Sequence, residues 1–227
     1  MDNEETDLEP QQERSRRTLT RLIQATAMTL MEHGLEGATI PRIAEISDVS
    51  PATVYRRFKD KKDLLRVAIL HVLESSNVGN RALLSKKLTC PTLGAAARQL
   101  IKLNFEQYRK NGHFIGALKQ FLESDEDPQF VNDARQALRI NLDLVVKAML
   151  VYRNEITNPD PERALRLAVL MTTQSIESFC LSTRSQWSTL RPIEDEELIE
   201  EFTRAFVAYL KSPPEKEQET DKANGKP

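Results

Sequence analysis

The chain is poor in glycine and in runs that alternate apolar with polar residues. Only 7 of its 227 residues are glycine, whereas β-sheets need frequent turns. Hydrophobic residues still make up 40% and charged residues 29% of the chain, which is ordinary for a protein with a buried core. The composition therefore favours an all-helical fold, long enough for one large domain or two small ones.

Long apolar runs and closely spaced cysteines are also missing. No stretch approaches the roughly 18 apolar residues that a membrane-spanning helix requires, and the acidic residues 1–5 do not resemble a secretory signal. The two cysteines, Cys90 and Cys180, lie far apart in the sequence, and we expect free thiols in a reducing compartment. These absences predict a cytoplasmic protein with no membrane partner.

The sequence also lacks the common catalytic and metal-binding patterns. Its three histidines, His33, His71 and His113, are scattered, and there is no HExxH, no Cys/His cluster, no GxSxG and no glycine-rich phosphate loop. We interpret the histidines as surface or packing residues. The prediction is a protein that is not an enzyme and uses neither a metal nor a cofactor.

The net charge of −2 conceals an uneven distribution. The first ten residues carry five acids and no base, whereas residues 11–70 carry eleven Lys and Arg against seven Asp and Glu. A locally basic segment in a mildly acidic protein is typical of a nucleic-acid-binding face. A basic face that is merely solvated remains an alternative on this evidence alone.

Apolar residues recur at helical spacing along most of the chain. The predicted helices cover about residues 17–34, 61 to beyond 73, 92–111, 114–122, 130–152, 162–183 and 195–210, with two shorter patterns at 43–47 and 52–58. Four segments result, namely a disordered tail (1–13), a small helical domain (14–75), a larger helical domain (76–211) and a second disordered tail (212–227).

Residues 39–58 have the spacing of a helix-turn-helix. In the first short helix Ile43 and Ala44 face inward, and Ala44 is small enough for a second helix to cross closely. Asp48 lies at the turn, where Asp tolerates a left-handed conformation, and Val49 packs beneath it. Ser50 then caps the second helix, whose first position is occupied by a proline.

The second helix of this motif has two contrasting sides. Its buried side is predicted to hold Pro51, Val54 and Phe58. Ala52, Thr53 and Arg56 project outward with Tyr55 on the flank. Methyl, hydroxyl, guanidinium and phenol groups are suited to contacts with thymine, phosphate and guanine in a DNA major groove.

The flanking residues favour phosphate binding. Asp60 and Asp63 are predicted to cap the next helix, while Lys61 and Lys62 lie at the positive end of its dipole, where a docked anion would compensate for them. Three further arginines, Arg14, Arg16 and Arg17, gather at the start of the first long helix. Thr39 is placed to cap the helix that follows it and to offer its hydroxyl to phosphate.

At this point the sequence resembles the tetracycline-repressor (TetR) family of bacterial regulators. The resemblance covers about residues 15–75 and rests on 34–39 (GLEGAT), Ile43-Ala44, Val49-Ser50, Thr53-Val54-Tyr55, Phe58, Lys61 and Leu64-Leu65. It implies a three-helix DNA-binding head, a connecting fourth helix, and a helical body that binds a ligand and dimerises. The resemblance also implies that Thr39, Tyr55 and Lys61 contact phosphate and that Ala52 and Thr53 face bases.

Two residues depart from the family pattern. Asp48 replaces the usual turn glycine, and Pro41 disfavours helical geometry at Ile40, which leaves the capping role of Thr39 open. The complete set of predicted DNA contacts is Arg17, Thr39, Arg42, Ala52, Thr53, Tyr55, Arg56 and Lys61.

The body offers weaker signals. Apolar stripes on its last two helices predict a homodimer interface at Leu165, Val169, Ile176, Phe202, Phe206 and Tyr209, although such stripes are also typical of core. A pocket for a small-molecule effector is predicted at Phe105, Tyr108, Phe121, Met149, Tyr152, Met171, Gln174 and Ser175, with core packing again the alternative.

The sequence therefore predicts a repressor that binds near-palindromic double-stranded operator DNA as a homodimer and is released by a small molecule. The alternative function is a helical ligand carrier or interaction module that has lost DNA binding.

Overall fold

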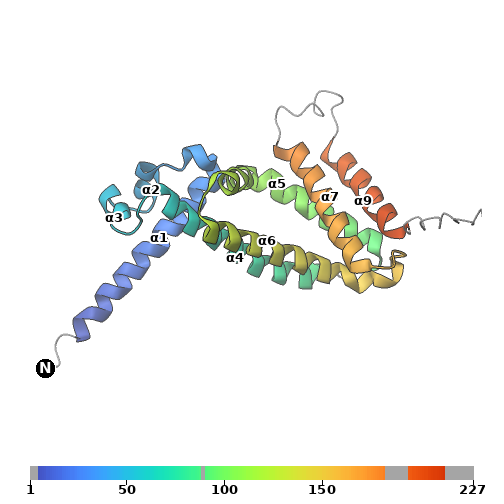
Figure 1. Cartoon of the computed structure of the whole chain (residues 1–227), viewed down its shortest axis with the longest axis horizontal. Helices are drawn as coiled ribbons and strands as arrows, with labels where there is room; N and C mark the ends of the chain where they lie inside the picture. Colours follow the sequence, from blue (N-terminus) through green and yellow to red (C-terminus); the bar gives the residue numbers. More distant parts are fainter. Residues whose placement is uncertain (1–4, 88–89, 182–193, 213–227) are drawn as a thin grey trace, which may run out of the picture.

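The computed structural model describes residues 5–87, 90–181 and 194–212, and every regular element in these ranges is helical. The all-helical prediction is therefore confirmed. Figure 1 shows an elongated molecule with α1–α3 at one end and α7 and α9 at the other. The elements are α1 (Glu5–Gly37), α2 (Ile40–Ile46), α3 (Pro51–Tyr55), α4 (Lys61–Lys87), α5 (Leu93–Ser124), α6 (Pro128–Met149), the 3-10 helix η1 (Leu150–Glu155), α7 (Pro161–Leu181) and α9 (Asp195–Lys211).

Helix α1 is longer than the sequence suggested. It begins at Glu5, so residues 5–13 are helical and the predicted disordered segment is wrong there. Gln, Glu and Arg predominate in residues 11–17 and are good helix formers. Gly34 interrupts the helix at φ 65° and ψ −164°, a conformation essentially restricted to glycine, which confirms the break predicted there.

Parts of the two predicted disordered tails lie outside the residues that the structure describes. These parts are residues 1–4 of the first tail and residues 213–227 of the second. Among the described ranges, no helix combines the length and the apolar character needed to cross a membrane.

The structure has two hydrophobic cores, and the boundary between them does not follow the order of the helices along the chain. One hydrophobic cluster joins α1–α4, as far as Leu73, to the second half of α5 and the first half of α6. A second cluster joins Leu84 near the end of α4 to the first half of α5, the second half of α6, η1, α7 and α9. The division predicted at residue 75 therefore does not separate two independent cores, because α5 and α6 each contribute to both.

A bend in α5 makes this sharing possible. Asn111 has non-helical torsion angles (φ −113°, ψ 21°) within the helix, at the point where the sequence predicted one helix to end and a shorter one to follow. Beyond the bend, Phe114 and Phe121 are buried in the cluster of the N-terminal helices. Phe121 meets Phe130 of α6 edge to face, with ring centroids 5.4 Å apart.

The segment between α5 and α6 is joined to α4 by a charged contact. Arg66 of α4 donates from Nε to both carboxylate oxygens of Asp125, at 3.0 and 3.1 Å, and its Nη1 lies 3.3 Å from Asp127. The Asp125 side chain is fully buried, whereas that of Arg66 is 24% exposed. Burial alone would raise the pKa of the Asp125 carboxyl, but hydrogen bonds from Arg66 and the Asp127 amide, with the charge of Arg66, hold it below its usual value.

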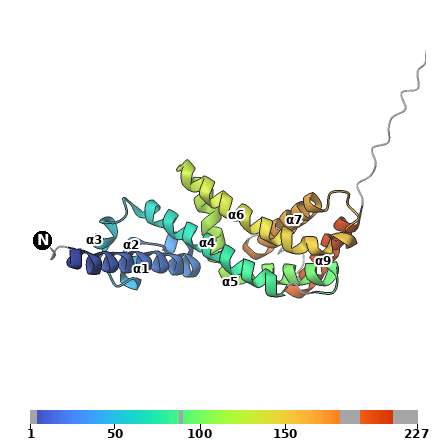
Figure 2. The same ribbon diagram turned by 90° about the horizontal axis from the view of Figure 1, so that it is seen from below.

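The same segment starts α6. Asp127 caps the helix by accepting hydrogen bonds from the amides of Gln129 and Phe130 at 3.0 and 3.2 Å, and Pro128 occupies the first turn. Helix α6 then lies beside α4, as Figure 1 and Figure 2 both show. Asp125 and Asp127 thus fix the point where the body meets α4.

The core at the far end of the body is built on aromatic contacts. Phe105 of α5 stacks on Phe202 of α9 with ring centroids 5.9 Å apart. The hydroxyl of Tyr152 donates to the carbonyl oxygen of Cys90 at 2.9 Å and accepts from its amide at 3.2 Å. Cys90 and Cys180 are both free thiols, as expected.

Candidate nucleic-acid interface

Helix α2 begins directly after Thr39. Thr39 occupies the N-cap position in an extended conformation, but its side chain makes no capping hydrogen bond. Pro41 lies in the first turn and Ile43 and Ala44 are buried, as predicted. The capping role that the sequence left open for Thr39 is therefore not observed, and Thr39 is exposed.

The turn between α2 and α3 has the predicted geometry. Asp48 adopts a left-handed conformation at φ 52°, and the Val49 amide donates to the carbonyl of Ala44 at 3.0 Å. Val49 is half-buried against the core. The turn thus holds α3 at a defined angle to α2.

An arginine of α1 secures this turn, and the sequence interpretation missed it. Arg21 donates to the main-chain oxygens of Ser47 and Asp48, the latter at 2.9 Å, and to the Asp48 carboxylate at 3.2 Å. Arg21 follows Arg14 and Arg17 at helical spacing, so its exposed position could have been inferred. Its partners lie 26 and 27 residues away, which no local pattern reveals.

Helix α3 is short and capped as predicted. Ser50 Oγ accepts a hydrogen bond from the Thr53 amide at 3.3 Å, and Val54 and Phe58 are 0% and 5% exposed. Pro51, however, is exposed, so its predicted place on the buried side is wrong. At the first position of a five-residue helix, its ring lies beyond the edge of the core that Val54 and Phe58 fill.

The outward side of α3 is polar and accessible. Ala52, Tyr55 and Arg56 are exposed, Tyr55 by 58%, and Thr53 is half-buried. A chain of hydrogen bonds runs along this side, from Ser50 Oγ to Thr53 Oγ1 at 3.0 Å and from Arg56 Nη2 to Thr53 Oγ1 at 2.9 Å. The Arg56 guanidinium is therefore held along the helix surface.

The start of α4 is capped reciprocally. The Asp63 amide donates to Asp60 Oδ1 at 2.9 Å, and the Asp63 carboxylate accepts from the Lys59 amide at 3.1 Å, in agreement with the predicted pair of caps. Lys61 is half-buried, and its ammonium lies 3.4 Å from the carbonyl of Leu35. Lys62 is exposed.

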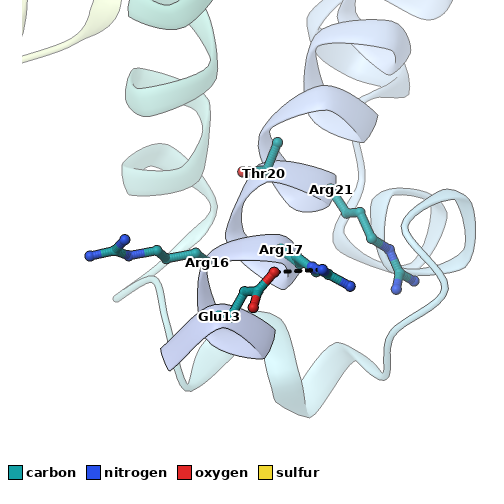
Figure 3. Close-up of a pocket in the computed structure, with 5 residues that line it drawn as sticks. All are labelled: Glu13, Arg16, Arg17, Thr20 and Arg21. Carbon is teal, nitrogen blue, oxygen red and sulfur yellow. Dashed lines mark hydrogen bonds and ion pairs between the residues drawn. The ribbon is translucent and has the colours of Figure 1, made fainter. Parts of the chain in front are cut away.

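Basic residues on α1 and α2 border these elements. Arg42 is exposed and donates to the carbonyl of Gly37 at 2.9 Å. On α1, Arg17 pairs with Glu13 at 2.5 Å. Figure 3 shows that Arg17 belongs to an open hollow lined by Glu13, Arg16, Arg17, Thr20 and Arg21.

These elements together present one kind of chemistry. The hydroxyl, phenol and guanidinium groups on the outward side of α3, the hydroxyl of Thr39 and the cations of α1, α2 and α4 can all donate hydrogen bonds, which match the acceptors of phosphates and of guanine in a duplex. Arg57, which follows α3, also donates to Ser15 of α1 at 3.1 Å. This contact, which the sequence did not suggest, joins α1 to the segment after α3.

The structure does not gather the predicted pocket residues around one space. Phe105, Tyr108, Met149 and Tyr152 are buried in the core of the body. Phe121 belongs to the other cluster, and Ser175 is half-buried while Met171 and Gln174 are exposed. The predicted lining is wrong for Phe121, Met171 and Gln174, because helical spacing alone did not show which side of α5 and α7 the core covers.

A small cluster of polar side chains lies between α5 and α7. Glu177 pairs with Lys119 at 2.6 Å and lies 3.5 Å from the Tyr108 hydroxyl, and Asn104 donates to Thr173 at 3.1 Å. Burial and the charge of Glu177 raise the pKa of the Tyr108 hydroxyl above its usual value.

The six residues predicted for the dimer interface lie within the subunit and not on its surface. Leu165 and Ile176 are 0% exposed, Phe206 is 3% exposed, and Val169, Phe202 and Tyr209 are half-buried. All six belong to the core of the subunit or pack against it. The structure instead exposes Leu167, Leu170 and Met171 on α7, by 41%, 47% and 51%.

Comparisons with known proteins agree with this geometry. The family model described as bacterial regulatory proteins, tetR family, matches residues 22–68. The whole fold is similar to that of a TetR-family regulator from Mesorhizobium loti, at a TM-score of 0.60 and 20% identity over 86% of this chain and 97% of that one. No curated protein matches the sequence.

Two further solved structures share the fold. FadR from Bacillus subtilis, solved in complex with stearoyl-CoA, has a TM-score of 0.56 at 17% identity over 85% of this chain and 97% of its own. PfmR from Thermus thermophilus has a TM-score of 0.55 at 17% identity over 83% and 97% of the two chains. At these identities the likeness concerns the fold.

Proposed function

Since this chain belongs to the tetR family of bacterial regulatory proteins and is a DNA-binding transcriptional regulator rather than an enzyme, we propose that it acts as a repressor. It binds a near-palindromic operator as a homodimer, and a small molecule bound by the body releases it. The observation that supports this proposal best is the outward side of α3, where Ala52, Tyr55 and Arg56 are exposed on a capped and anchored helix.

We assign the recognition of DNA bases to the outward side of α3 and to Arg56, which follows its last residue. The Ala52 methyl suits the methyl of thymine, and a guanidinium suits guanine. Because Arg56 is held by Thr53 at 2.9 Å, it loses less conformational freedom on binding than an unrestrained arginine would. Thr53 and Arg56 therefore act as one unit, with Ser50 fixing the other side of the Thr53 hydroxyl.

Phosphate contacts surround this helix. Thr39, Arg42, Tyr55, Lys61 and Arg17 are proposed to bind the DNA backbone and to set the orientation of α3. The free hydroxyl of Thr39 supports its role, because no capping bond competes for it. Lys61 is half-buried, and its ammonium can leave the carbonyl oxygen of Leu35, 3.4 Å away, to bind a phosphate instead.

Selection of bound duplexes from a random pool tests the proposal. A two-fold symmetric motif, with half-sites about one helical turn apart, is the expected result. Tyr55→Ala and Lys61→Ala should then weaken binding to the selected duplex by about 5- to 150-fold, equivalent to about 1–3 kcal/mol. Lys102→Ala, on the exposed surface of α5, is the matched control and should bind normally.

Tyr55→Phe separates two roles of this side chain. If the hydroxyl binds phosphate, Tyr55→Phe loses most of what Tyr55→Ala loses, whereas a packing role would leave Tyr55→Phe near wild type. Unchanged binding in both Tyr55→Ala and Lys61→Ala would favour the alternative function, a helical carrier or interaction module that does not bind DNA.

The proposed homodimer uses the exposed side of α7. Leu167, Leu170 and Met171 form an apolar stripe there, and on α9 the small residues Ala205 and Ala208 are exposed. Small side chains let a second pair of helices approach closely, and apolar area buried between copies stabilises a two-fold four-helix contact. This surface replaces the six core residues that the sequence had suggested.

A charge placed in this stripe tests the dimer. Leu170→Glu should give a monomer in light scattering and weaken operator binding by about 100-fold or more, because the two half-sites are no longer bound together. Val78→Glu is the matched control, since Val78 is 74% exposed on α4, and it should remain a dimer. A Leu170→Glu dimer would show that the interface lies elsewhere.

The proposed effector acts through the body. FadR from Bacillus subtilis, which shares this fold, was solved with stearoyl-CoA bound, and this supports a ligand role for the helical body here. Because α5 and α6 belong to both cores, a ligand that shifts them would change the position of the N-terminal helices. A ligand lowers operator affinity only by the ratio of its affinities for the two states, so release is tested by titrating each candidate compound against a preformed complex.

A further inference from the structure

Helix α3 has little packing of its own to fix its direction. Of its five residues, Pro51–Tyr55, Val54 alone is buried, and helices of this length are marginal without outside support. Phe58, beyond the end of the helix, is the next buried side chain. The direction in which α3 presents its outward side chains therefore depends on the contacts that hold the segments before and after it.

Helix α1 contacts both of these segments. Before α3, Arg21 donates from Nη2 to the main-chain oxygens of Ser47 and Asp48 and to the Asp48 carboxylate. After α3, the hydroxyl of Ser15 accepts a hydrogen bond from Arg57 at 3.1 Å. Six positions of helix separate Ser15 from Arg21, which is about 9 Å, and the five residues of α3 span about 7.5 Å. The two contacts are thus spaced to hold α3 at both ends.

Arg21 acts mainly on the backbone of the turn. Ser47 is the C-cap of α2, and the carbonyl oxygens at the end of a helix lack partners within the helix. A cation at this end is also stabilised by the helix dipole. The Asp48 carboxylate, by contrast, is 97% exposed, so its ion pair with Arg21 contributes little. The main-chain oxygens of Ser47 and Asp48 are therefore the principal acceptors.

The turn also has a conformation that is unfavourable for its residue. Asp48 has φ 52°, in the left-handed region that Asp adopts less readily than glycine. Two contacts keep the turn in this conformation, namely the hydrogen bond from the Val49 amide to the Ala44 carbonyl at 3.0 Å and that from Arg21 to the Asp48 carbonyl at 2.9 Å. Without Arg21, the Asp48 peptide is free to rotate, and the direction of α3 changes with it.

We propose that Arg21 is a positioning residue for DNA recognition, which raises operator affinity by holding the turn before α3 and makes no contact with DNA itself. The inference rests on the proposed function, and it separates Arg21 from Arg17, the cation of α1 that is assigned there to phosphate. Arg17 pairs with Glu13 on α1 itself (Figure 3), whereas Arg21 binds a turn 26 and 27 residues away.

A positioning role has a distinct effect on binding. If α3 samples several directions, only the fraction of molecules with the correct direction binds the operator, and the apparent affinity falls by that fraction. The complex that forms is the same, with the same number of phosphate contacts. Because the salt dependence of binding reports that number, a positioning residue changes the affinity without changing the salt dependence.

Operator affinity measured over a range of salt concentrations tests the proposal. Arg21→Gln keeps a good helix former and removes the guanidinium. We expect binding to the selected duplex to weaken by about 3- to 10-fold, the net worth of about one hydrogen bond, while the slope of log K against log salt stays at the wild-type value. Arg17→Gln provides the contrast, with a slope shallower by about 0.9 per subunit. Arg135→Gln, on the exposed surface of α6, is the matched control and should bind as wild type.

Hydrogen exchange of the free protein tests the turn directly. The amides of Val49 and Thr53 bond within the turn and to the cap of α3, so they should lose protection in Arg21→Gln and keep it in Arg135→Gln. Circular dichroism shows whether each variant is folded. A fully folded variant would bind as wild type if Arg21 only stabilised the fold.

Three results would overturn the inference and leave the proposed function standing. Wild-type affinity in a folded Arg21→Gln would show that the turn needs no such contact. A slope shallower by about 0.9 would show that Arg21 binds a phosphate directly. A loss of affinity with wild-type exchange at Val49 and Thr53 would place the role of Arg21 outside the turn. If wild-type protein selects no motif at all, the proposed function fails and the inference fails with it.

Discussion

The ion pair between Arg66 and Asp125 offers a quantitative test of how the DNA-binding helices are joined to the body. Replacing Arg66 with methionine keeps the aliphatic volume but removes the donors to a carboxylate that is fully buried. Asp125 would then keep the amide of Asp127, at 2.9 Å, as its remaining hydrogen-bond donor. A buried charge that loses its partner is costly to the folded state.

The magnitude follows from the burial of the two side chains. Breaking a buried pair typically costs about 3–5 kcal/mol, and Arg66 is itself 24% exposed, so that water can partly replace it. We therefore expect the free energy of unfolding to fall by about 3 kcal/mol, at the low end of that range. For a chain of this length, such a loss lowers Tm by about 6–12 °C.

Urea denaturation followed by circular dichroism measures this loss, at one protein concentration for all variants. Arg98→Met is the matched control, because the pairs of Arg98 with Glu196 and Glu200 are exposed and should contribute little. Arg66→Met/Asp125→Asn should recover part of the stability, since it also removes the isolated charge. A loss in Arg66→Met no larger than that in Arg98→Met would refute the reasoning.

The pH dependence of this loss has a defined sign. The pKa of Asp125 is held below its usual value in the folded chain, so the ion pair stabilises the fold above the pKa of the unfolded state, near 3.9. That contribution disappears as the pH falls through the folded-state pKa. Because the unfolded states of the two proteins are alike, the difference between wild type and Arg66→Met should be constant near neutral pH. It should shrink as the pH falls through the pKa of Asp125 in the variant, which burial without Arg66 raises above that of wild type.

Three further predictions concern the backbone of the N-terminal helices, and urea denaturation measures each. Gly34→Ala should lose about 1–3 kcal/mol, because Gly34 has a conformation that only glycine adopts readily; wild-type stability would mean that α1 can pass this point as a regular helix. Ser50→Ala should lose about 1 kcal/mol with its cap to Thr53, and no loss would show that the cap is dispensable. At Asp48, where φ is 52°, Ala should cost about 1 kcal/mol while Gly should not, and equal stability of the two variants would contradict a strained turn.

Local chemistry was sufficient to predict the helix-turn-helix. The turn conformation of Asp48, the cap of Ser50 and the paired caps of Asp60 and Asp63 all depend on residues within five positions of one another. Such contacts form from the local backbone, and a sequence pattern records them directly. The break at Gly34 was predictable for the same reason, and Pro51 was misplaced because burial at a helix end depends on neighbours that are distant in the sequence.

The body shows where sequence patterns stopped being informative. Its helices were predicted in nearly the right places, but an apolar stripe does not show whether it packs within the subunit or against a partner. Leu165 and Ile176 were assigned to a dimer interface and lie in the core. Leu170 and Met171, on another side of the same helix, are exposed. When a helix has apolar residues on two sides, its sequence does not show which side packs within the subunit and which side could pack against a partner.

The sequence alone determined the helical class, the helix-turn-helix and the polar side of its second helix, because each of these follows from contacts over one or two helical turns. Tertiary structure decided that α5 bends at Asn111 to join two cores, that Arg66 meets a buried Asp125, and that Arg21 of α1 binds the turn after α2. These depend on pairings between residues far apart in the chain, such as the 59 positions between Arg66 and Asp125. Only packing selects such pairings, since many alternatives are equally compatible with the local pattern.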